Sequence, residues 1–304
     1  MNPIAPSRSA FSITELFVVI AIVLVVLGLL LPAVQKVRST AYQTDCGNRL
    51  RQIGLALHGH NDSMNRLPAG SSDASGGATA QVAWLTFILP WIEQSSLWGK
   101  TEQALRSRLP FHTNPPHVGL NVVIPTYICP LDFRLVIPQY IDNYGFEVAF
   151  TSFLGVQGTA SGANDGVLFY GSRIRLTDVV DGLSNTLMAG ERPPSADLEF
   201  GWWYGGSGIS TGGGTWPNGT ADMVLGVRET LIGSNSYGCT PGSYHFTAGN
   251  LANQCDMFHF WSLHPGGAHF LMADSSIRFL SYSADAILPA LATRNGSEPV
   301  ALPD

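Results

Sequence analysis

The chain has 304 residues, and its 22 acidic and 16 basic side chains give a formal net charge of −6. This acidic balance excludes a general nucleic-acid-binding protein, which needs a basic face. The 45% hydrophobic content excludes a disordered chain. Only 12% of the residues are charged, and the 33 glycines and 19 prolines are typical of short strands joined by many turns.

The longest apolar run lies near the N-terminus. Residues 16–34, LFVVIAIVLVVLGLLLPAV, contain no charged side chain, and a helix needs about 20 such residues to cross a bilayer core. A buried core helix is the alternative, but core helices are usually shorter and carry a polar stripe. The run is also too long for a cleaved secretory signal peptide. We therefore expect one membrane span and a large water-exposed remainder.

The apolar run continues into a polar segment with helical spacing. Its apolar residues lie four, three and four positions apart, which places them on one face of a helix: Cys46, Leu50, Ile53 and Leu57. The sequence thus predicts a single helix from about residue 12 to 58, in which residues 11–35 span the membrane and residues 36–60 are amphipathic. Pro32 lies inside this helix and is expected to kink or loosen it.

Glu15 is the one ionisable side chain between Arg8 and Lys36. A carboxylate near the end of a membrane helix costs up to about 3 kcal/mol when it is unpaired, and such residues usually mark a function. Glu15 is either an interfacial side chain that reaches the lipid headgroups or the partner of a positive group. That group would belong to another chain or be an amine created by cleavage nearby.

Residues 10–15, Ala-Phe-Ser-Ile-Thr-Glu, followed by the long apolar run, resemble the processing site of type IV pilins and type II secretion pseudopilins. The resemblance implies cleavage between Ala10 and Phe11 by a prepilin peptidase, with N-methylation of the new terminus. Glu15 would then be the fifth residue of the mature chain and would pair with the Phe11 amine of a neighbouring subunit. Pro32 matches the helix-kinking proline of this family, whereas Ala10 stands where the family usually has glycine.

The same resemblance implies where the parts of the chain lie. Residues 1–10 would be a cytoplasmic leader, and the protein would be a single-pass inner-membrane protein with an exported body, found in a periplasmic or cell-surface filament after assembly. The flanking charges do not decide the orientation, because Arg8 precedes the span while Lys36 and Arg38 follow it. The implied partners are other copies of the chain or other pilin-like subunits, the prepilin peptidase and membrane lipid, with no nucleic acid.

The four cysteines form no CxxC motif, so neither a zinc knuckle nor a thioredoxin-type motif is indicated: Cys46, Cys129, Cys239 and Cys255. Free buried thiols are one interpretation. An even number in an exported body favours two disulfides instead. Three pairings are possible, and the spacing does not decide among them. The pairing that we expect joins Cys239 to Cys255 in a short loop, which leaves Cys46 and Cys129 to tie the helix to the body.

Residues 61–304 are expected to form one globular body with short strands. The strands are predicted at residues 122–132, broken by Pro125 and ended by Pro130, at 151–160, 166–176 and 185–191, and in a hairpin of residues 269–274 and 277–280. A short helix is predicted around residues 92–109. The fold class is therefore α+β, with a pilin-like long N-terminal helix, transmembrane in its first half, packed on a β-rich globular body.

Aromatic residues gather in two places of this body. Those of residues 84–98 are expected to pack in the core rather than to form a sugar-binding platform: Trp84, Phe87, Trp91 and Trp98. The glycine-rich tract of residues 201–219 carries Trp202, Trp203 and Trp216. These three side chains form either a carbohydrate or partner surface or anchors that fold back onto the body, and we favour anchors.

Five further segments resemble a large family of pilin-like proteins that is abundant in planctomycete bacteria and carries a C-terminal domain of unknown function, also labelled solute-binding-like. They are residues 46–62, 84–98, 127–132, 178–192 and 264–276. The terminal motif of that family is a histidine, nine residues and Asp-Gly. His264 and Asp274 match this spacing, whereas Ser275 replaces the glycine. The resemblance implies no established activity for the body.

His264 and Asp274 also raise the question of catalysis or metal binding, since three more histidines are near in sequence: His245, His259 and His269. The chain has no G-x-S-x-G, H-E-x-x-H or P-loop motif. We therefore expect no enzyme and no cofactor. His264 is expected to cap a turn with its ring, and Asp274 to hold the next turn through its carboxylate. A calcium ion at Asp274 is the lesser alternative.

The sequence taken together predicts a structural subunit of a type IV pilus or of a type II secretion-like pseudopilus that assembles through its N-terminal helix. The alternative is a membrane-anchored surface protein that binds a glycan or another solute and does not polymerise. An enzyme on a membrane stalk ranks third.

Overall fold

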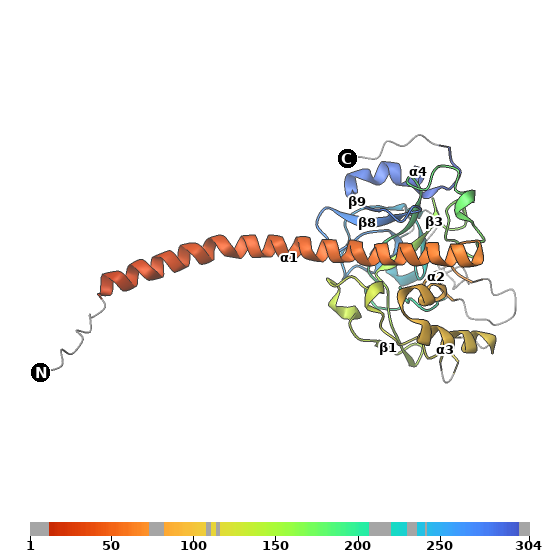
Figure 1. Cartoon of the computed structure of the whole chain (residues 1–304), viewed down its shortest axis with the longest axis horizontal. Helices are drawn as coiled ribbons and strands as arrows, with labels where there is room; N and C mark the ends of the chain where they lie inside the picture. The colour runs from red at the N-terminus through yellow and green to blue at the C-terminus, as the bar shows by residue number, and fades with distance from the viewer. Residues whose placement is uncertain are drawn as a thin grey trace, which may run out of the picture. The chain divides into compact units, whose positions relative to one another are not determined.

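The structure of the protein, a computed structural model, describes residues 12–72, 82–107, 111–113, 116–206, 220–229, 236–240 and 242–297. The chain forms two compact units, residues 1–44 and 45–304. Helix α1, Ile13–Met64, begins in the first unit and ends in the second, which is a mixed α+β body (Figure 1).

The described residues form four α-helices and nine strands. The helices are α1 (Ile13–Met64), α2 (Trp84–Phe87), α3 (Ser95–Arg106) and α4 (Leu288–Ala292). The strands are β1 (Gln139–Ile141), β2 (Phe146–Val148), β3 (Phe153–Gly158), β4 (Leu187–Glu191), β5 (Val224–Gly226), β6 (Arg228–Glu229), β7 (Tyr244–His245), β8 (Gly267–Met272) and β9 (Ile277–Ser281).

The first part of α1 is apolar on all sides. None of the side chains in its most apolar 18-residue stretch is buried within the chain, and the helix is long and apolar enough to cross a membrane. Leu29, for example, is 71% exposed. The predicted single helix is confirmed, and it continues through Pro32 and six residues beyond the predicted end. Since water would penalise this surface strongly, lipid or other apolar helices are its natural surroundings.

The second part of α1 packs on the body along the predicted face. The four residues of that face are fully buried: Cys46, Leu50, Ile53 and Leu57. Two glycines allow the helix to come this close. A Cβ atom on Gly54 would lie 2.6 Å from the side chain of Leu271 on β8, and one on Gly59 would overlap the ring of Trp91. This part of α1 therefore fits between β8 and the segment that follows α2 (Figure 1).

A five-stranded sheet in the order β5-β3-β4-β8-β9 forms the centre of the body. Strands β3 and β5 pair in parallel, and the other neighbours pair antiparallel. Both faces of the sheet are covered. On β8, Leu271 packs in the core that includes the α1 face, whereas Phe270 and Met272 pack in a second core that includes α4. The strands predicted at β3, β4 and the β8–β9 hairpin are confirmed, as is the helix at α3.

Two of the predicted strands are wrong. Residues 122–132 contain a 3₁₀ turn at Pro125–Tyr127 and no strand. The fixed φ and missing N–H of Pro125 suit the start of such a turn and not a strand ladder. Residues 166–176 contribute only an isolated bridge between Tyr170 and Ser71, because Gly171 takes a φ of +64° and turns the chain there.

The aromatic residues pack in or against the core, as expected. Trp84 and Trp203 are fully buried and Trp202 is 4% exposed, whereas Phe87, Trp91 and Trp98 are partly buried and pack against that core. The indole N–H of Trp84 donates to the carbonyl of Met223, and that of Trp203 donates to the carbonyl of Val122. Trp202 and Trp203 thus act as anchors and offer no exposed platform to a sugar. Trp216 lies outside the described residues.

The β8–β9 turn holds a serine in a conformation that favours glycine. Ser275 has a φ of +66°, and its hydroxyl finds no hydrogen-bond partner in the described part of the chain. The preceding Asp274 carboxylate accepts a 2.8 Å hydrogen bond from the N–H of Ser276, which is the Asx turn predicted from the sequence. The turn therefore keeps the geometry of an Asp-Gly turn without its glycine.

We expect Ser275→Gly to stabilise the body by roughly 0.5–1 kcal/mol, because it relieves the left-handed conformation and removes an unpaired hydroxyl. In a thermal unfolding scan the midpoint should rise by about 1–3 °C. Ser276→Gly is the matched control, since Ser276 is not among the residues of positive φ, and it should lower the midpoint. A decrease with both variants would contradict the argument.

Glu229 on β6 is a buried acid with no cationic partner among the described residues. Its carboxylate accepts hydrogen bonds from the N–H and hydroxyl of Ser161, from the N–H of Gly226 and from the amide of Gln157. Burial raises the pKa of Glu229 from its ordinary value of 4.5, although these hydrogen bonds work against the increase. Folding therefore shifts the balance of Glu229 toward its protonated form.

The raised pKa of Glu229 predicts a loss of stability with increasing pH. Its contribution is fully present below the unfolded-state pKa of 4.5 and is lost as the pH rises through the higher folded-state pKa. Glu229→Gln cannot titrate. The unfolding midpoint of the parent minus that of this variant, measured between about pH 4 and pH 8, should therefore fall as the pH rises above 4.5 and level off above the folded-state pKa. A difference that stays constant over this range would contradict the prediction.

Candidate functional site

The N-terminal end of α1 carries the first of the predicted site residues. Ala10 and Phe11 lie outside the described residues. The N–H of Ser12 donates a 2.8 Å hydrogen bond to Oε2 of Glu15, and the N–H of Thr14 donates to the Ser12 hydroxyl at 3.3 Å. This Ser-x-x-Glu arrangement resembles a capping box, and a carboxylate at a helix N-terminus is also favoured by the helix dipole. Glu15 therefore has a local partner within the single chain.

All four cysteines are paired as expected from the sequence. Cys46 bonds to Cys129, which is 83 residues away, with a Cα–Cα distance of 5.4 Å. Cys239 bonds to Cys255, which is 16 residues away, with a Cα–Cα distance of 5.5 Å. The first disulfide ties the buried part of α1 to the loop before β1, and both disulfides lie within the second unit.

The His264 ring does not cap a turn, and this part of the prediction is wrong. Its Nε2 atom lies 3.7 Å from Sγ of Cys129 and 3.2 Å from Oε1 of Glu191. The turn is held instead by the backbone N–H of His264, which donates to the Ser262 hydroxyl at 3.0 Å. The imidazole ring is not needed to hold the turn of residues 262–267, and it faces the Cys46–Cys129 disulfide instead.

Glu191, the last residue of β4, lies between two histidines. Its Oε2 atom accepts hydrogen bonds from the N–H of His269 at 2.7 Å and from Nδ1 of the same residue at 3.1 Å. Its Oε1 atom faces His264 but accepts no hydrogen bond of normal geometry. Burial alone would raise the pKa of Glu191, but the contacts with His264 and His269 outweigh it and lower the pKa to about 2. The buried carboxylate is therefore ionised.

Among the described residues, one group of side chains has the composition and spacing of a metal site. The ligand atoms of its four members lie within 4.8 Å of one another, and all four residues are buried: Cys46, Cys129, Glu191 and His264. Asp274, which the sequence paired with His264, is not part of it. We name this group the C2EH cluster. A cavity of about 10 Å³ lies beside it, lined in part by Cys129 and Glu191.

Each member of the C2EH cluster comes from a different one of the segments by which the sequence resembles the pilin-like planctomycete family. Cys46 lies on α1, Cys129 in the loop before β1, Glu191 at the end of β4 and His264 just before β8. Sequence reasoning identified Cys46, Cys129 and His264 separately and missed Glu191. The one signal available was an acidic side chain, Glu191, at the end of the predicted strand of residues 185–191.

A known protein family matches the last part of the first unit and most of the second. The family described as "Protein of unknown function (DUF1559)" matches residues 35–286. The chain belongs to this family. The matched region contains the whole C2EH cluster and both disulfides, whereas Glu15 and Pro32 precede it. No curated protein and no solved structure gave a match.

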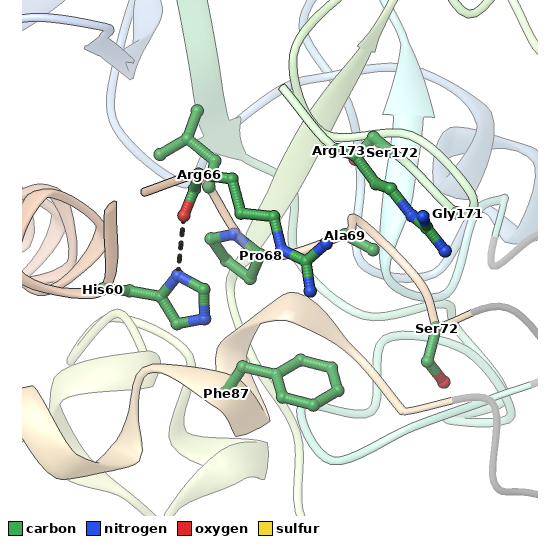
Figure 2. A pocket seen from close by; sticks show the side chains of 10 residues that line it. His60, Arg66, Pro68, Ala69, Ser72, Phe87, Gly171, Ser172 and Arg173 are labelled. Carbon is green, nitrogen blue, oxygen red and sulfur yellow. Dashed lines mark hydrogen bonds between the residues drawn. The ribbon is translucent and has the colours of Figure 1, made fainter. Parts of the chain in front are cut away.

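The DUF1559 body also has an open pocket of about 190 Å³ with a cationic lining. Figure 2 shows His60 and Arg66 on one side of it and Ser172 and Arg173 on the other. His60 shares a 3.0 Å hydrogen bond with the carbonyl of Arg66, and burial lowers the pKa of His60 (Figure 2). No carboxylate of the described residues pairs with Arg66 or Arg173. This pocket has the chemistry to hold a small anion.

A second pocket of about 210 Å³ in the DUF1559 body is lined by aromatic and acidic side chains: Phe111, His112, Tyr144, Phe146, Glu199, Phe200, Trp202 and Asp222. Trp202 meets the ring edges of Tyr144 and Phe146 there. Because Trp202 is almost fully buried, the ring that this pocket offers to a ligand is that of Tyr144, which is 47% exposed. One aromatic face is a weak basis for a glycan site.

Proposed function

We propose that the protein is a pilin-like structural subunit of a type IV pilus or of a type II secretion-like pseudopilus. The observation that carries the proposal is α1. Its first part exposes apolar side chains all round, and the same helix, without a break, becomes a buried element of the DUF1559 body. A helix of this kind holds the subunit in the bilayer and then packs with the helices of other subunits. The proposed role contains no catalytic step.

Assembly by this route exchanges lipid contacts for helix–helix contacts. Lipid tails are as apolar as these side chains, so burial alone drives the exchange only weakly, and a specific polar pair is needed to direct it. The carboxylate of Glu15 supplies one member of such a pair, and the amine of Phe11 on a neighbouring subunit supplies the other. Two opposite charges compensate each other in a medium of low dielectric constant, whereas either one alone is costly there.

Processing gives the most direct test of the proposal. We expect protein extracted from the membrane of its native host to begin at Phe11, with the amine methylated, because a prepilin peptidase removes residues 1–10. Intact-mass measurement together with N-terminal sequencing checks this. Protein that retains Met1 would contradict the proposal and would support a plain anchor with an exported body.

Glu15 variants separate the intermolecular pair from the local cap. Glu15→Gln keeps an oxygen that can accept from the N–H of Ser12, but it carries no charge. If the charge directs assembly, both Glu15→Gln and Glu15→Ala should abolish filaments in the fraction sheared from cells. Glu102→Ala, an exposed change on α3, is the control and should leave the filament yield unchanged. Normal filaments with Glu15→Gln would show that Glu15 is only a cap.

The cationic pocket favours a second candidate function, a membrane-anchored protein that binds an anionic solute and does not polymerise. Its test is calorimetric titration of the full-length protein with inorganic phosphate, with a dicarboxylate and with a neutral sugar. Binding of either anion that is lost in Arg66→Ala and in Arg173→Ala, but kept in Glu15→Gln, would favour this candidate. Absence of anion binding would exclude it for these probes.

A further inference from the structure

We propose that the reduced form of the protein binds one Zn²⁺ ion at the C2EH cluster, in place of the Cys46–Cys129 disulfide. The ligands are the thiolates of Cys46 and Cys129, Nε2 of His264 and Oε1 of Glu191. The disulfide and the zinc ion exclude each other, because both use the same two sulfur atoms. This inference does not depend on filament assembly.

The donor set matches zinc. Two thiolates, one imidazole and one carboxylate are the ligand types that zinc takes in four-coordinate sites, and thiolates disfavour calcium and magnesium, which prefer oxygen. All four protein ligands come from the chain, which leaves no open position for a substrate. The adjoining cavity of about 10 Å³ has room for about one water-sized particle. The site is therefore structural, not catalytic.

Two edges of the ligand tetrahedron are already present in the oxidised structure. With Zn–S near 2.3 Å and Zn–N and Zn–O near 2.05 Å, a tetrahedral site has a sulfur–nitrogen edge of about 3.6 Å and a nitrogen–oxygen edge of about 3.3 Å. The distance from Sγ of Cys129 to Nε2 of His264 is 3.7 Å, and that from Nε2 to Oε1 of Glu191 is 3.2 Å. The two sulfur atoms must separate to about 3.8 Å, and the three remaining edges start from distances of no more than 4.8 Å.

The carboxylate of Glu191 is placed as a metal ligand requires. Its Oε1 atom is buried, points at His264 and accepts no hydrogen bond from any described residue, an arrangement that is costly for a charged oxygen without a cation. Its Oε2 atom accepts hydrogen bonds from the backbone N–H and from the ring Nδ1 of His269. A metal-binding carboxylate is usually oriented by such outer hydrogen bonds. The structure thus fixes one oxygen and leaves the other for the ion.

The disulfide and zinc forms interconvert by a two-electron exchange. A phosphine reductant gives two electrons to the disulfide and takes the oxygen of one water molecule, and the two sulfur atoms gain the two protons. When Zn²⁺ binds, each thiol releases its proton to the buffer as the Zn–S bond forms. In the reverse direction a small disulfide accepts two electrons and two protons in thiol–disulfide exchange, the Cys46–Cys129 bond forms, and the zinc ion leaves with water ligands.

The experiment uses full-length Cys239→Ser/Cys255→Ser protein in detergent micelles, so that Cys46 and Cys129 are the only cysteines. After reduction with a phosphine, zinc is added in competition with a colorimetric chelator. We expect one zinc ion per chain, and X-ray absorption should show two sulfur ligands near 2.3 Å and two nitrogen or oxygen ligands near 2.0–2.1 Å. Zinc should also raise the thermal midpoint of this reduced protein, since the four ligands converge only in the folded chain.

Matched variants locate the site. In the same background, His264→Ala should weaken zinc binding by at least about 100-fold. His259→Ala removes another buried histidine, which pairs with Asp256 outside the cluster, and should leave the affinity within about threefold of the background. The complementary variant, Cys46→Ser/Cys129→Ser, keeps Cys239 and Cys255. It should bind no zinc ion with two sulfur ligands.

Four results would overturn the proposal. The first is zinc with fewer than two sulfur ligands in the Cys239→Ser/Cys255→Ser protein. The second is zinc binding that does not raise its thermal midpoint. The third is equal loss of affinity in His264→Ala and His259→Ala. The fourth is zinc binding by the oxidised parent as tight as that by the reduced variant. Each can be observed without any filament assay, so failure here leaves the proposed pilin-like role untouched.

Discussion

Replacing both Cys46 and Cys129 by serine should lower the free energy of unfolding of the DUF1559 body by roughly 4.5 kcal/mol. The disulfide closes a loop of 83 residues, and the stabilisation from a cross-link grows with the logarithm of the loop length because the unfolded chain loses more freedom. The same relation gives roughly 3 kcal/mol for the 16-residue loop between Cys239 and Cys255.

The two double-serine variants therefore form a pair with an expected order. Denaturant unfolding of full-length, zinc-free protein, followed by the fluorescence of the buried tryptophans, measures both. The larger loss should belong to Cys46→Ser/Cys129→Ser. A larger loss in Cys239→Ser/Cys255→Ser would contradict this order. It would show that residual structure in the unfolded chain reduces the entropy that the Cys46–Cys129 disulfide removes.

Glu191→Ala should destabilise the oxidised, chelator-treated protein by about 3–5 kcal/mol. The change removes a buried carboxylate that contacts the rings of both His264 and His269, and it leaves the N–H of His269 without its acceptor. Glu191→Gln should cost less, because the amide oxygen can still accept from that N–H. Denaturant unfolding again supplies the free energies.

Glu102→Ala is the control for the Glu191 variants, since it removes an exposed carboxylate that pairs with Arg106 one turn along α3. It should cost less than about 0.5 kcal/mol. If Glu191→Ala cost no more than Glu102→Ala, the buried carboxylate would contribute nothing net to the fold, and its place between the two histidines would need another explanation.

Helix α1 and several of the strands could be predicted from the sequence. The spacing of Cys46, Leu50, Ile53 and Leu57 gave the packed face of α1, and the apolar run gave its exposed part. Short apolar segments bounded by turn residues gave β3, β4 and the β8–β9 hairpin. The failures at Pro125 and Gly171 have one cause: a short apolar segment reads as a strand unless its backbone constraints are weighed against its side chains.

The C2EH cluster could not be predicted in the same way. Its members come from four distant segments, and no local motif connects Glu191 with His264. The sequence motif of fixed spacing connects His264 with Asp274 instead. The carboxylate of Asp274, however, only holds the neighbouring turn. Only the pairing order of the sheet, which sets β4 beside β8, brings the glutamate to the histidine.

The position of Cys46 has a mechanical consequence. It is the first buried residue of α1 as the helix enters the body. A tensile load that travels along the helix therefore reaches a covalent bond to Cys129 before it reaches the packed side chains of Leu50 and Ile53. The bond diverts the load into the backbone at Cys129, so the helix cannot be drawn out of the fold by shearing its contacts one after another.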